Sequence, residues 1–229
     1  MATVALVTGG NRGIGKEVCR QLVDLGYTVI IGSRDEAKGR KVAKELGGQP
    51  LAHAVQLDVT STESIQRARR YVEKEFGVLD VLINNAGINF DRDQQASTAD
   101  LDNIRDTMET NLYGPWSCTM IFRPLLDKSD NPRIVNVSSG FLGSLAVMRG
   151  GNPAYGISKA ALDALTIKLA SELRHMRVNA VCPGWIATEM GGPGGGPIEP
   201  GGQSIVWAAT LPKNGPTGGF FRYGKRIPW

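Results

Sequence analysis

Tyr155 and Lys159 are the first side chains whose types and spacing suggest chemistry. They stand four residues apart in a stretch with helical periodicity, so the phenol and the ammonium share one helix face. A phenol ionises only near pH ~10, so it is a poor base at neutral pH until a nearby positive charge stabilises its anion. Lys159 supplies that charge, and the pair could exchange a proton with a substrate oxygen. Alone the pair is weak, because many surface helices carry Tyr and Lys at this spacing.

Two further polar positions could serve the same chemistry. The apolar run Arg133–Ser138 predicts a strand and is followed by Ser139. A serine at a strand's carboxyl end can donate to a carbonyl oxygen as that oxygen gains negative charge, whereas Ser138, on the opposite side, could simply bond backbone. Asn111 falls inside an expected helix, Leu101–Leu126, where Asn is a poor helix former. It could bind water or a backbone carbonyl, or be solvated surface.

Glycines mark a strand-to-helix turn near the start of the chain. The expected strand Thr3–Thr8 runs into TGGNRGIG at 8–15 and then into a helix. There the backbone can approach a pyrophosphate, and the helix N-terminus offers free N–H groups and partial positive charge. A tight turn without a ligand is the alternative. The expected dinucleotide contacts are Gly9, Asn11, Arg12, Gly13, Ile14 and Gly15.

The end of the second expected strand, Thr28–Ser33, indicates which dinucleotide binds. An NAD-binding protein of this architecture usually places an acid there. This chain instead has Ser33 and Arg34, which suit a 2′-phosphate, and Arg12 could add a second positive charge. Asp35 is the counter-indication, although it also suits the N-cap of the next helix. We therefore expect NADP(H) in preference to NAD(H).

The third and fourth expected strands, Ala52–Asp58 and Val81–Asn84, end at the same sheet edge, where an open α/β fold binds its ligand. Asp58 could accept from the adenine amine. Asn85 could equally brace the sheet or contact the cofactor. The expected contacts here are Asp58, Val59, Asn85, Ala86 and Gly87.

Short β-branched runs alternate with amphipathic stretches along the whole chain, which predicts βαβ units around a buried parallel sheet. We expect a single-domain α/β protein over residues 1–229, doubly wound in the Rossmann manner, with a seven-stranded parallel sheet flanked by helices on both faces. The remaining expected strands are Val178–Cys182 and Gly219–Phe221. The other expected helices are Gly15–Leu25, Glu36–Leu46, Thr62–Phe76, Ala154–Leu173 and Gln203–Thr210.

Composition excludes several other classes. The 229 residues carry a net charge of +4, but the basic residues alternate with acids, which indicates solvated helix faces and not a nucleic-acid surface. Three widely separated cysteines predict neither disulfides nor a metal site. The strand-like start leaves no room for a leader, and no 18-residue apolar run occurs, so we expect a cytoplasmic protein without a membrane partner. Residues 191–202 hold seven glycines and three prolines, which predicts a mobile lid over 188–202.

Together these motifs resemble the short-chain dehydrogenase/reductase superfamily. They span the full chain in the family's order, and the Ser-Arg pair at 33–34 and GPTGGFFR at 215–222 are most similar to its carbonyl-reductase-like members. The remaining motifs are TGGNRGIG (8–15), LDVT (57–60), NNAG (84–87), Asn111, NVSS (136–139), YGISK (155–159) and CPGW (182–185).

The resemblance implies a catalytic tetrad. Tyr155 would exchange the proton, Ser139 would polarise the carbonyl, Lys159 would bind the nicotinamide ribose and lower the pKa of the tyrosine, and Asn111 would hold a relay water. Hydride would pass directly between nicotinamide and the carbonyl carbon. The same resemblance places four residues beside the nicotinamide or a phosphate: Pro183, Gly184, Ile186 and Thr188.

The chain departs from the usual pattern mainly in a longer interval between Ser139 and Tyr155. Apolar residues in that interval and after the sixth strand predict an uncharged, fairly hydrophobic ketone or aldehyde substrate, although they could equally be core. They are Phe141, Leu142, Val147, Met148, Trp185 and Met190. A 3-oxoacyl-thioester or steroid reductase is one alternative. A non-catalytic NADP(H) sensor is another, although such a protein would be expected to lose a tetrad member.

Assembly is expected from the same helices. They carry more apolar residues than one sheet face would cover, which favours a homodimer or homotetramer. The residues concerned are Trp116, Met120, Ile121, Leu162, Leu165 and Leu169.

Overall fold

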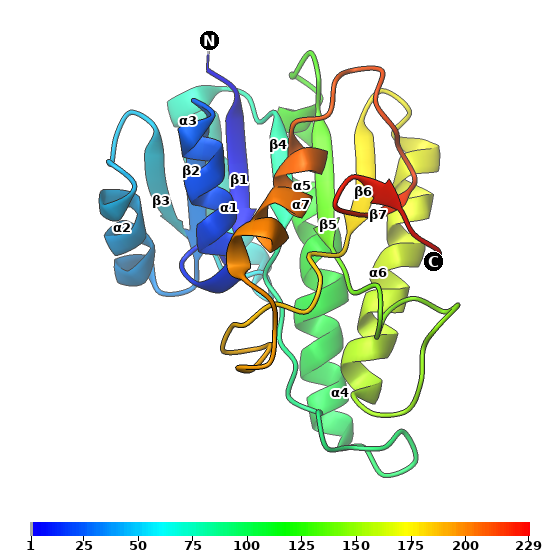
Figure 1. Cartoon of the computed structure of the whole chain (residues 1–229). Helices are drawn as coiled ribbons and strands as arrows, with labels where there is room; N and C mark the ends of the chain where they lie inside the picture. Colours follow the sequence, from blue (N-terminus) through cyan, green and yellow to red (C-terminus); the bar gives the residue numbers. More distant parts are fainter. Residues whose placement is uncertain (1) are drawn as a thin grey trace.

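The computed structural model describes residues 2–229, which fold around one sheet (Figure 1). The strand order is β3-β2-β1-β4-β5-β6-β7-β8, and every neighbouring pair is parallel except β7 and β8. The strands are β1 (Val4–Thr8), β2 (Thr28–Ser33), β3 (Ala52–Gln56), β4 (Val81–Asn84), β5 (Arg133–Val137), β6 (Arg177–Val181), β7 (Phe220–Arg222) and β8 (Lys225–Arg226).

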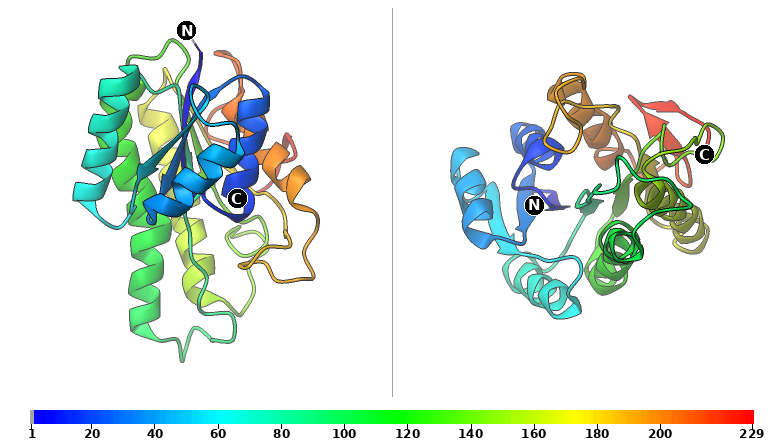
Figure 2. Two further views of the ribbon diagram at one scale, coloured as in Figure 1. Left: turned by 90° about the vertical axis from the view of Figure 1, so that its left-hand side faces the viewer. Right: turned by 90° about the horizontal axis from the view of Figure 1, so that it is seen from below.

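Helices cover both faces of the sheet, with α1, α2 and α7 on one side and α3, α5 and α6 on the other (Figure 2). Alternating strand residues feed two separate cores: Leu82 belongs to one cluster and Ile83 to the other. The helices are α1 (Gly13–Asp24), α2 (Glu36–Glu45), α3 (Thr62–Phe76), α4 (Leu101–Met108), η1 (Glu109–Tyr113), α5 (Gly114–Leu126), α6 (Pro153–Glu172) and α7 (Ile198–Ala209). The Rossmann-like α/β architecture is therefore confirmed.

The predicted count of seven strands is wrong, because a short eighth strand closes the sheet. β8 pairs antiparallel with β7 through Tyr223 and Gly224, whose φ angles are +51° and +72°. Two consecutive positive φ values define the hairpin turn that matches strand twist. The sequence pattern missed it because Tyr rarely takes this conformation.

The helix predicted over 101–126 is three segments. α4 ends at Met108, one π-helical turn (η1) follows, and α5 begins at Gly114. Within the π turn, Asn111 directs its side chain to backbone outside the helix, which is the kind of competition that distorts a helical ladder. Gly114 lies against Val59, where an added Cβ would come within 2.8 Å of the valine side chain.

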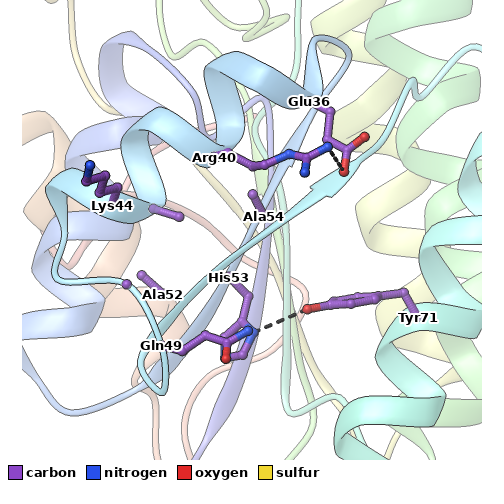
Figure 3. Close-up of a pocket in the computed structure, with 10 residues that line it drawn as sticks. Glu36, Arg40, Lys44, Gln49, Ala52, His53, Ala54 and Tyr71 are labelled. Atoms are coloured by element: carbon purple, nitrogen blue, oxygen red, sulfur yellow. Dashed lines mark hydrogen bonds and ion pairs between the residues drawn. The ribbon is translucent and has the colours of Figure 1, made fainter.

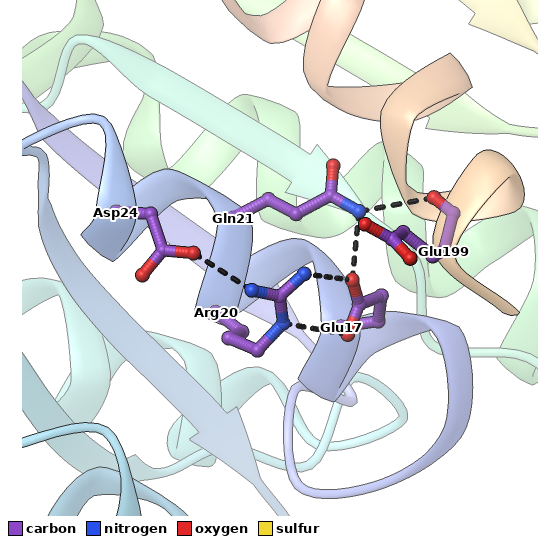
Figure 4. Close-up of polar contacts among 5 residues, drawn as sticks. All are labelled: Glu17, Arg20, Gln21, Asp24 and Glu199. Atoms are coloured by element: carbon purple, nitrogen blue, oxygen red, sulfur yellow. Dashed lines mark hydrogen bonds and ion pairs between the residues drawn. The ribbon is translucent and has the colours of Figure 1, made fainter.

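The second half of the glycine-rich segment is helical, which corrects the expected start of the last helix from Gln203 to Ile198. Pro200 falls in the first turn, where its missing N–H leaves no intrahelical bond unmade. A Cβ on Gly202 would approach Gln21 Nε2 to 2.7 Å, so glycine lets α7 pack closely on α1. Gln21 also donates to the Glu199 carbonyl at 3.0 Å (Figure 4). Residues 198–202 are thus anchored to the sheet's helical layer.

The helix that carries Tyr155 is held at its start by a distant acid. α6 begins after Asn152, whose own side chain makes no capping bond, and Pro153 has no N–H to offer. Asp91, from the loop after β4, is fully buried and accepts from the Ala154 N–H at 2.5 Å. A residue 63 positions upstream therefore does the work of an N-cap next to Tyr155.

We predict that Asp91→Ala lowers the free energy of unfolding by about 1–3 kcal/mol, because it strands a buried N–H at the start of α6. Asp91→Asn keeps an acceptor oxygen and should lose less. Urea denaturation of both variants beside the wild type measures the difference, and equal stability of Asp91→Ala and wild type would show that the tether is dispensable.

Candidate active site

Tyr155 lies in the first turn of α6 and is partly buried. Burial raises the pKa of its phenol well above the ordinary value, and the nearby Cys182 thiol adds to the rise, whereas the Ser139 hydroxyl opposes it. The phenol is therefore protonated at neutral pH in this environment. It could give up a proton readily only when a positive charge stabilises the phenolate.

Lys159 places such a charge beside the phenol. Its Nζ lies 5.7 Å from the centroid of the Tyr155 ring and donates to the Val137 carbonyl at 2.8 Å. The side chain is only 4% exposed, and burial lowers the pKa of its ammonium to about 8. Because this value stays above neutrality, most of the lysine is charged at pH 7.

Ser139 follows β5 and faces Tyr155, while Ser138 turns away. The Ser139 hydroxyl accepts from the Leu142 N–H at 3.3 Å and lowers the pKa of the tyrosine, which places the two hydroxyls together. Ser138 Oγ donates to the Lys159 carbonyl at 3.4 Å, which is the backbone-bonding alternative. The choice of Ser139 over Ser138 agrees with this geometry.

Asn111 is fully buried in η1 and connects to the tyrosine through one intermediate. Its amide donates to the Ile88 carbonyl at 2.9 Å and to Ser158 Oγ at 3.1 Å, and its oxygen accepts from the Ile88 N–H. Ser158 donates in turn to the Tyr155 carbonyl at 2.7 Å. Sequence reasoning missed Ser158, although its place three residues after Tyr155 puts it on the same helix face.

Gly87 borders the space between Asn111 and Lys159. A Cβ built there would lie 3.2 Å from Asn111 Oδ1 and 3.6 Å from Lys159 Nζ. A larger residue at 87 would fill this space. The NNAG sequence therefore ends in a glycine where the side chains of the site converge.

The glycine turn fits a pyrophosphate. Gly9 and Gly13 have positive φ angles of 63° and 51°, and a Cβ on Gly15 would collide with the Gly9 carbonyl oxygen. The N-cap residue Arg12 makes no capping bond through its side chain, and the first turn of α1 holds no acidic residue. The helix N-terminus thus keeps its N–H groups and partial positive charge for an anion. Asn11 and Ile14 complete the turn.

The predicted 2′-phosphate contacts differ in their surroundings. Ser33 is buried and donates to the Asp35 carbonyl at 2.7 Å, so its proton is committed to the protein. Arg34 is exposed at the strand end. Asp35 accepts from the Lys38 N–H at 3.2 Å and caps α2, as expected. Arg34 is therefore the better placed of the two predicted contacts.

The side chains of Asp58 and Asn85 are largely occupied by hydrogen bonds to other residues of the protein. One Asp58 oxygen accepts from the Thr60 N–H and hydroxyl, at 3.0 and 2.8 Å. The Asn85 amide donates to the Thr8 and Gly9 carbonyls, at 2.8 and 3.2 Å, which is the bracing alternative. Val59 is buried against Gly114, and Ala86 lies against Gly9.

The segment after β6 returns to the glycine turn. Thr188 lies beside Gly13, where an added Cβ would be 3.7 Å from the threonine methyl group, and Arg12 forms an ion pair with Glu189. Pro183 and Gly184 contact Tyr223, whose hydroxyl donates to the Pro183 carbonyl at 3.2 Å. Ile186 is buried beneath them.

The glycine-rich segment at 191–202 packs closely against neighbouring backbone, although its composition predicts a mobile chain. A Cβ on Gly191 would collide with the Ile186 carbonyl oxygen, and one on Gly195 would also collide with that backbone. Trp185 Nε1 donates to the Gly191 carbonyl at 2.8 Å. These glycines permit close backbone packing, so their number alone does not measure mobility.

The six predicted substrate-pocket residues split into two groups. Leu142 and Met148 lie beside Gly156 in the first turn of α6, next to Tyr155. Phe141 and Trp185 are 69% and 68% exposed, so they are not core residues. The remaining pair, Val147 and Met190, is also exposed.

A groove of about 340 Å³ lies elsewhere, between α2, β3 and α3 (Figure 3). Its polar wall includes His53, whose Nδ1 is 3.2 Å from the Tyr71 hydroxyl, and Arg40, paired with Glu36 at 2.9 Å. The groove lies at the outer edge of the sheet, beside the edge strand β3. None of the predicted catalytic, cofactor-binding or substrate-binding residues lines it.

Comparison with known proteins agrees with this geometry. Residues 3–194 match the family described as short chain dehydrogenase. The chain is 32% identical to (+)-neomenthol dehydrogenase from Capsicum annuum, covering 97% of this chain and 96% of that protein. It is also 32% identical to carbonyl reductase (NADPH) 1 from Bos taurus, covering 99% and 98%.

Solved structures show the same likeness. The NADPH-bound carbonyl reductase from chicken fatty liver superposes with a TM-score of 0.89 at 28% identity, covering 100% of this chain and 99% of that one. The alignment with the Capsicum annuum enzyme runs over 305 positions against 229 residues here, so that relative carries internal residues that this chain lacks. With a matching family, relatives above 30% identity and a shared fold, the chain belongs to the short chain dehydrogenase family of oxidoreductases.

Proposed function

We propose that this chain is an NADP(H)-dependent carbonyl reductase that uses Tyr155 as proton donor and, in reverse, as the base that oxidises an alcohol. The observation that carries the proposal is the meeting of Tyr155, Lys159, Ser139 and Asn111 at the carboxyl edge of the sheet, beside an uncapped helix N-terminus. The relatives named for carbonyl reduction and neomenthol oxidation support it.

Each side chain has a separate task in this proposal. Bound NADPH supplies the hydride that reduces the carbonyl carbon. Tyr155 gives its proton to the carbonyl oxygen, and Ser139 donates a hydrogen bond to that oxygen as its negative charge grows. Lys159 stabilises the phenolate that remains. Asn111 holds Ser158 and the Ile88 backbone in place and is suited to keep a water near Lys159 that returns the proton.

The glycine turn and the free first turn of α1 would hold the pyrophosphate, while Arg34 and Arg12 would meet the 2′-phosphate. Arg12 is paired with Glu189, so a cofactor phosphate would compete with that carboxylate. The competition links cofactor binding to the 188–202 segment, which we propose as a lid whose moving part is confined to residues before α7.

The proposed substrate class rests on the apolar side chains that lie near Tyr155. The Met148 side chain beside the helix and the exposed side chains of Phe141 and Trp185 favour an uncharged, fairly hydrophobic ketone or aldehyde. A 3-oxoacyl-thioester or steroid reductase shares all the same machinery and stays an alternative. A non-catalytic sensor is disfavoured, because all four tetrad residues are present and adjacent.

Tyr155→Phe tests the proton role. Turnover of menthone or benzaldehyde with NADPH should fall by roughly 10²–10⁴-fold, because the phenolic proton is gone. NADPH affinity, followed by fluorescence, should stay within about twofold of wild type. Tyr113→Phe, at an exposed tyrosine on η1, is the matched control and should keep wild-type turnover. Unchanged turnover in Tyr155→Phe would reject the assignment.

Arg34→Ala tests the cofactor preference. Losing a charged hydrogen bond to the 2′-phosphate should weaken NADPH binding by about 1.5–3 kcal/mol and leave NADH binding nearly unchanged. Arg40→Ala, on the exposed face of α2, controls for the general loss of positive charge. Equal weakening of both cofactors in Arg34→Ala would remove the 2′-phosphate interpretation.

We also propose that the chain forms a homodimer or homotetramer in the cytoplasm. Trp116 and Met120 on α5 and Ile167 on α6 are exposed, but Leu162, Leu165 and Leu169 belong to the protein's own core, so the apolar surface is smaller than the sequence indicated. The three cysteines are free and buried, which suits a reducing compartment. No helix in residues 2–229 is long and apolar enough to cross a membrane.

Light scattering should give a mass of two or four chains, and Met120→Glu should shift it toward one chain by placing a charge in the interface. A single-chain mass for the wild type at micromolar concentration would contradict the proposed assembly.

A further inference from the structure

Behind Lys159, α6 carries a second buried ionisable group that the proposed chemistry does not use. Asp163 stands one helical turn further on and is only 3% exposed. Its carboxyl oxygens make no hydrogen bond of ordinary geometry with the described residues, although the Ser138 hydroxyl lies close enough to lower the pKa of the carboxyl. A buried carboxyl without partners is costly, and a merely structural position would be served better by Asn or Leu.

Three residues after Asp163 on α6, Thr166 ends a buried polar seam, which we define as Asn84, Asn136 and Thr166, between β4, β5 and α6. Asn84 donates to Asn136 at 2.8 Å, and Asn136 donates to Thr166 at 2.9 Å. The Asn84 amide oxygen also has no partner among residues 2–229. The seam contains no ionisable residue of its own.

Lys159 and Asp163 act on each other's charge. Burial raises the pKa of the Asp163 carboxyl to about 7, and the nearby Ser138 hydroxyl and the Lys159 ammonium oppose that rise. Burial lowers the pKa of Lys159 to about 8, and Asp163 opposes that fall. The other titratable groups at this place are Tyr155 on α6 and Cys182 at the end of β6.

We propose that Asp163 is a positioning residue that acts through Lys159, as the buried counter-charge one helical turn away that sets the pH range in which the lysine carries its ammonium. This inference rests on the proposed function, because Lys159 matters only if Tyr155 exchanges a proton.

Asp163→Asn tests the inference on the whole protein. Without the counter-charge, Lys159 loses its proton at lower pH. The alkaline limb of kcat/KM for NADPH-dependent benzaldehyde reduction should move down by about one pH unit. Thr166→Val, which removes a hydroxyl from the polar seam without touching charge, should leave that midpoint in place. An unmoved midpoint in Asp163→Asn overturns the proposal.

Thermal stability against pH gives a readout independent of activity. A carboxyl whose pKa is raised in the folded state stabilises the fold fully below its unfolded value of about 4 and loses that contribution as pH rises through about 7. Asparagine cannot ionise, so the Tm of Asp163→Asn relative to wild type should increase from pH 5 to pH 8.5. A constant difference would show that the carboxyl does not titrate in the fold, and the proposal would fail.

Lys159→Met supplies the reciprocal measurement if Asp163→Asn does not fold. Removing the ammonium should move the Asp163 transition in the stability profile to higher pH, and an unmoved transition contradicts the coupling. These profiles need no substrate. An inactive wild type would therefore reject the proposed reductase function while the stability data still decide whether Lys159 and Asp163 are coupled.

Discussion

The candidate site depends on one buried ammonium group, that of Lys159. Lys159 is buried, its Nζ bonded to the Val137 carbonyl, and burial already lowers its pKa to about 8. A buried ammonium stays charged only when nearby polar groups compensate part of the solvation free energy that it lost on burial. The Val137 carbonyl does so by accepting a hydrogen bond and the Tyr155 ring by presenting its face, and these two contacts fix where the lysine points. Its position then decides how easily Tyr155 can release a proton.

Hydrogen bonds from side chains to distant backbone groups hold this arrangement in register. Asn85 braces β1 against the turn after β4, Asn111 ties η1 to the Ile88 backbone, and Asp91 caps α6 from a distant loop. These side chains bond mainly to backbone groups, and Asn111 also donates to the Ser158 hydroxyl. The ligand-facing edge is consequently built from glycines and helix ends, where N–H groups stay free.

The sequence predicted the architecture well because a parallel sheet imposes a strong pattern of apolar runs, and because glycine turns and the Tyr155–Lys159 spacing are local features. It failed where contacts are long-range. Nothing near Asp91 signals that it caps a helix 63 residues later, and the π turn at Asn111 depends on Ile88. Gly202 indicated mobility in sequence but is required by the close approach of α7 to Gln21. A glycine in the sequence allows either a mobile chain or close backbone packing, and only the long-range contacts of the fold determine which of the two occurs.

In the proposed reaction, hydride passes from a nicotinamide to a carbonyl carbon while Tyr155 supplies the proton. Reduction of menthone with NADPH deuterated at nicotinamide C4, followed by mass spectrometry of the alcohol, tests it most directly. We expect one deuterium on the carbon that bears the new hydroxyl and no deuterium at that carbon when only the solvent is labelled. An alcohol that takes its carbon-bound hydrogen from solvent would contradict it.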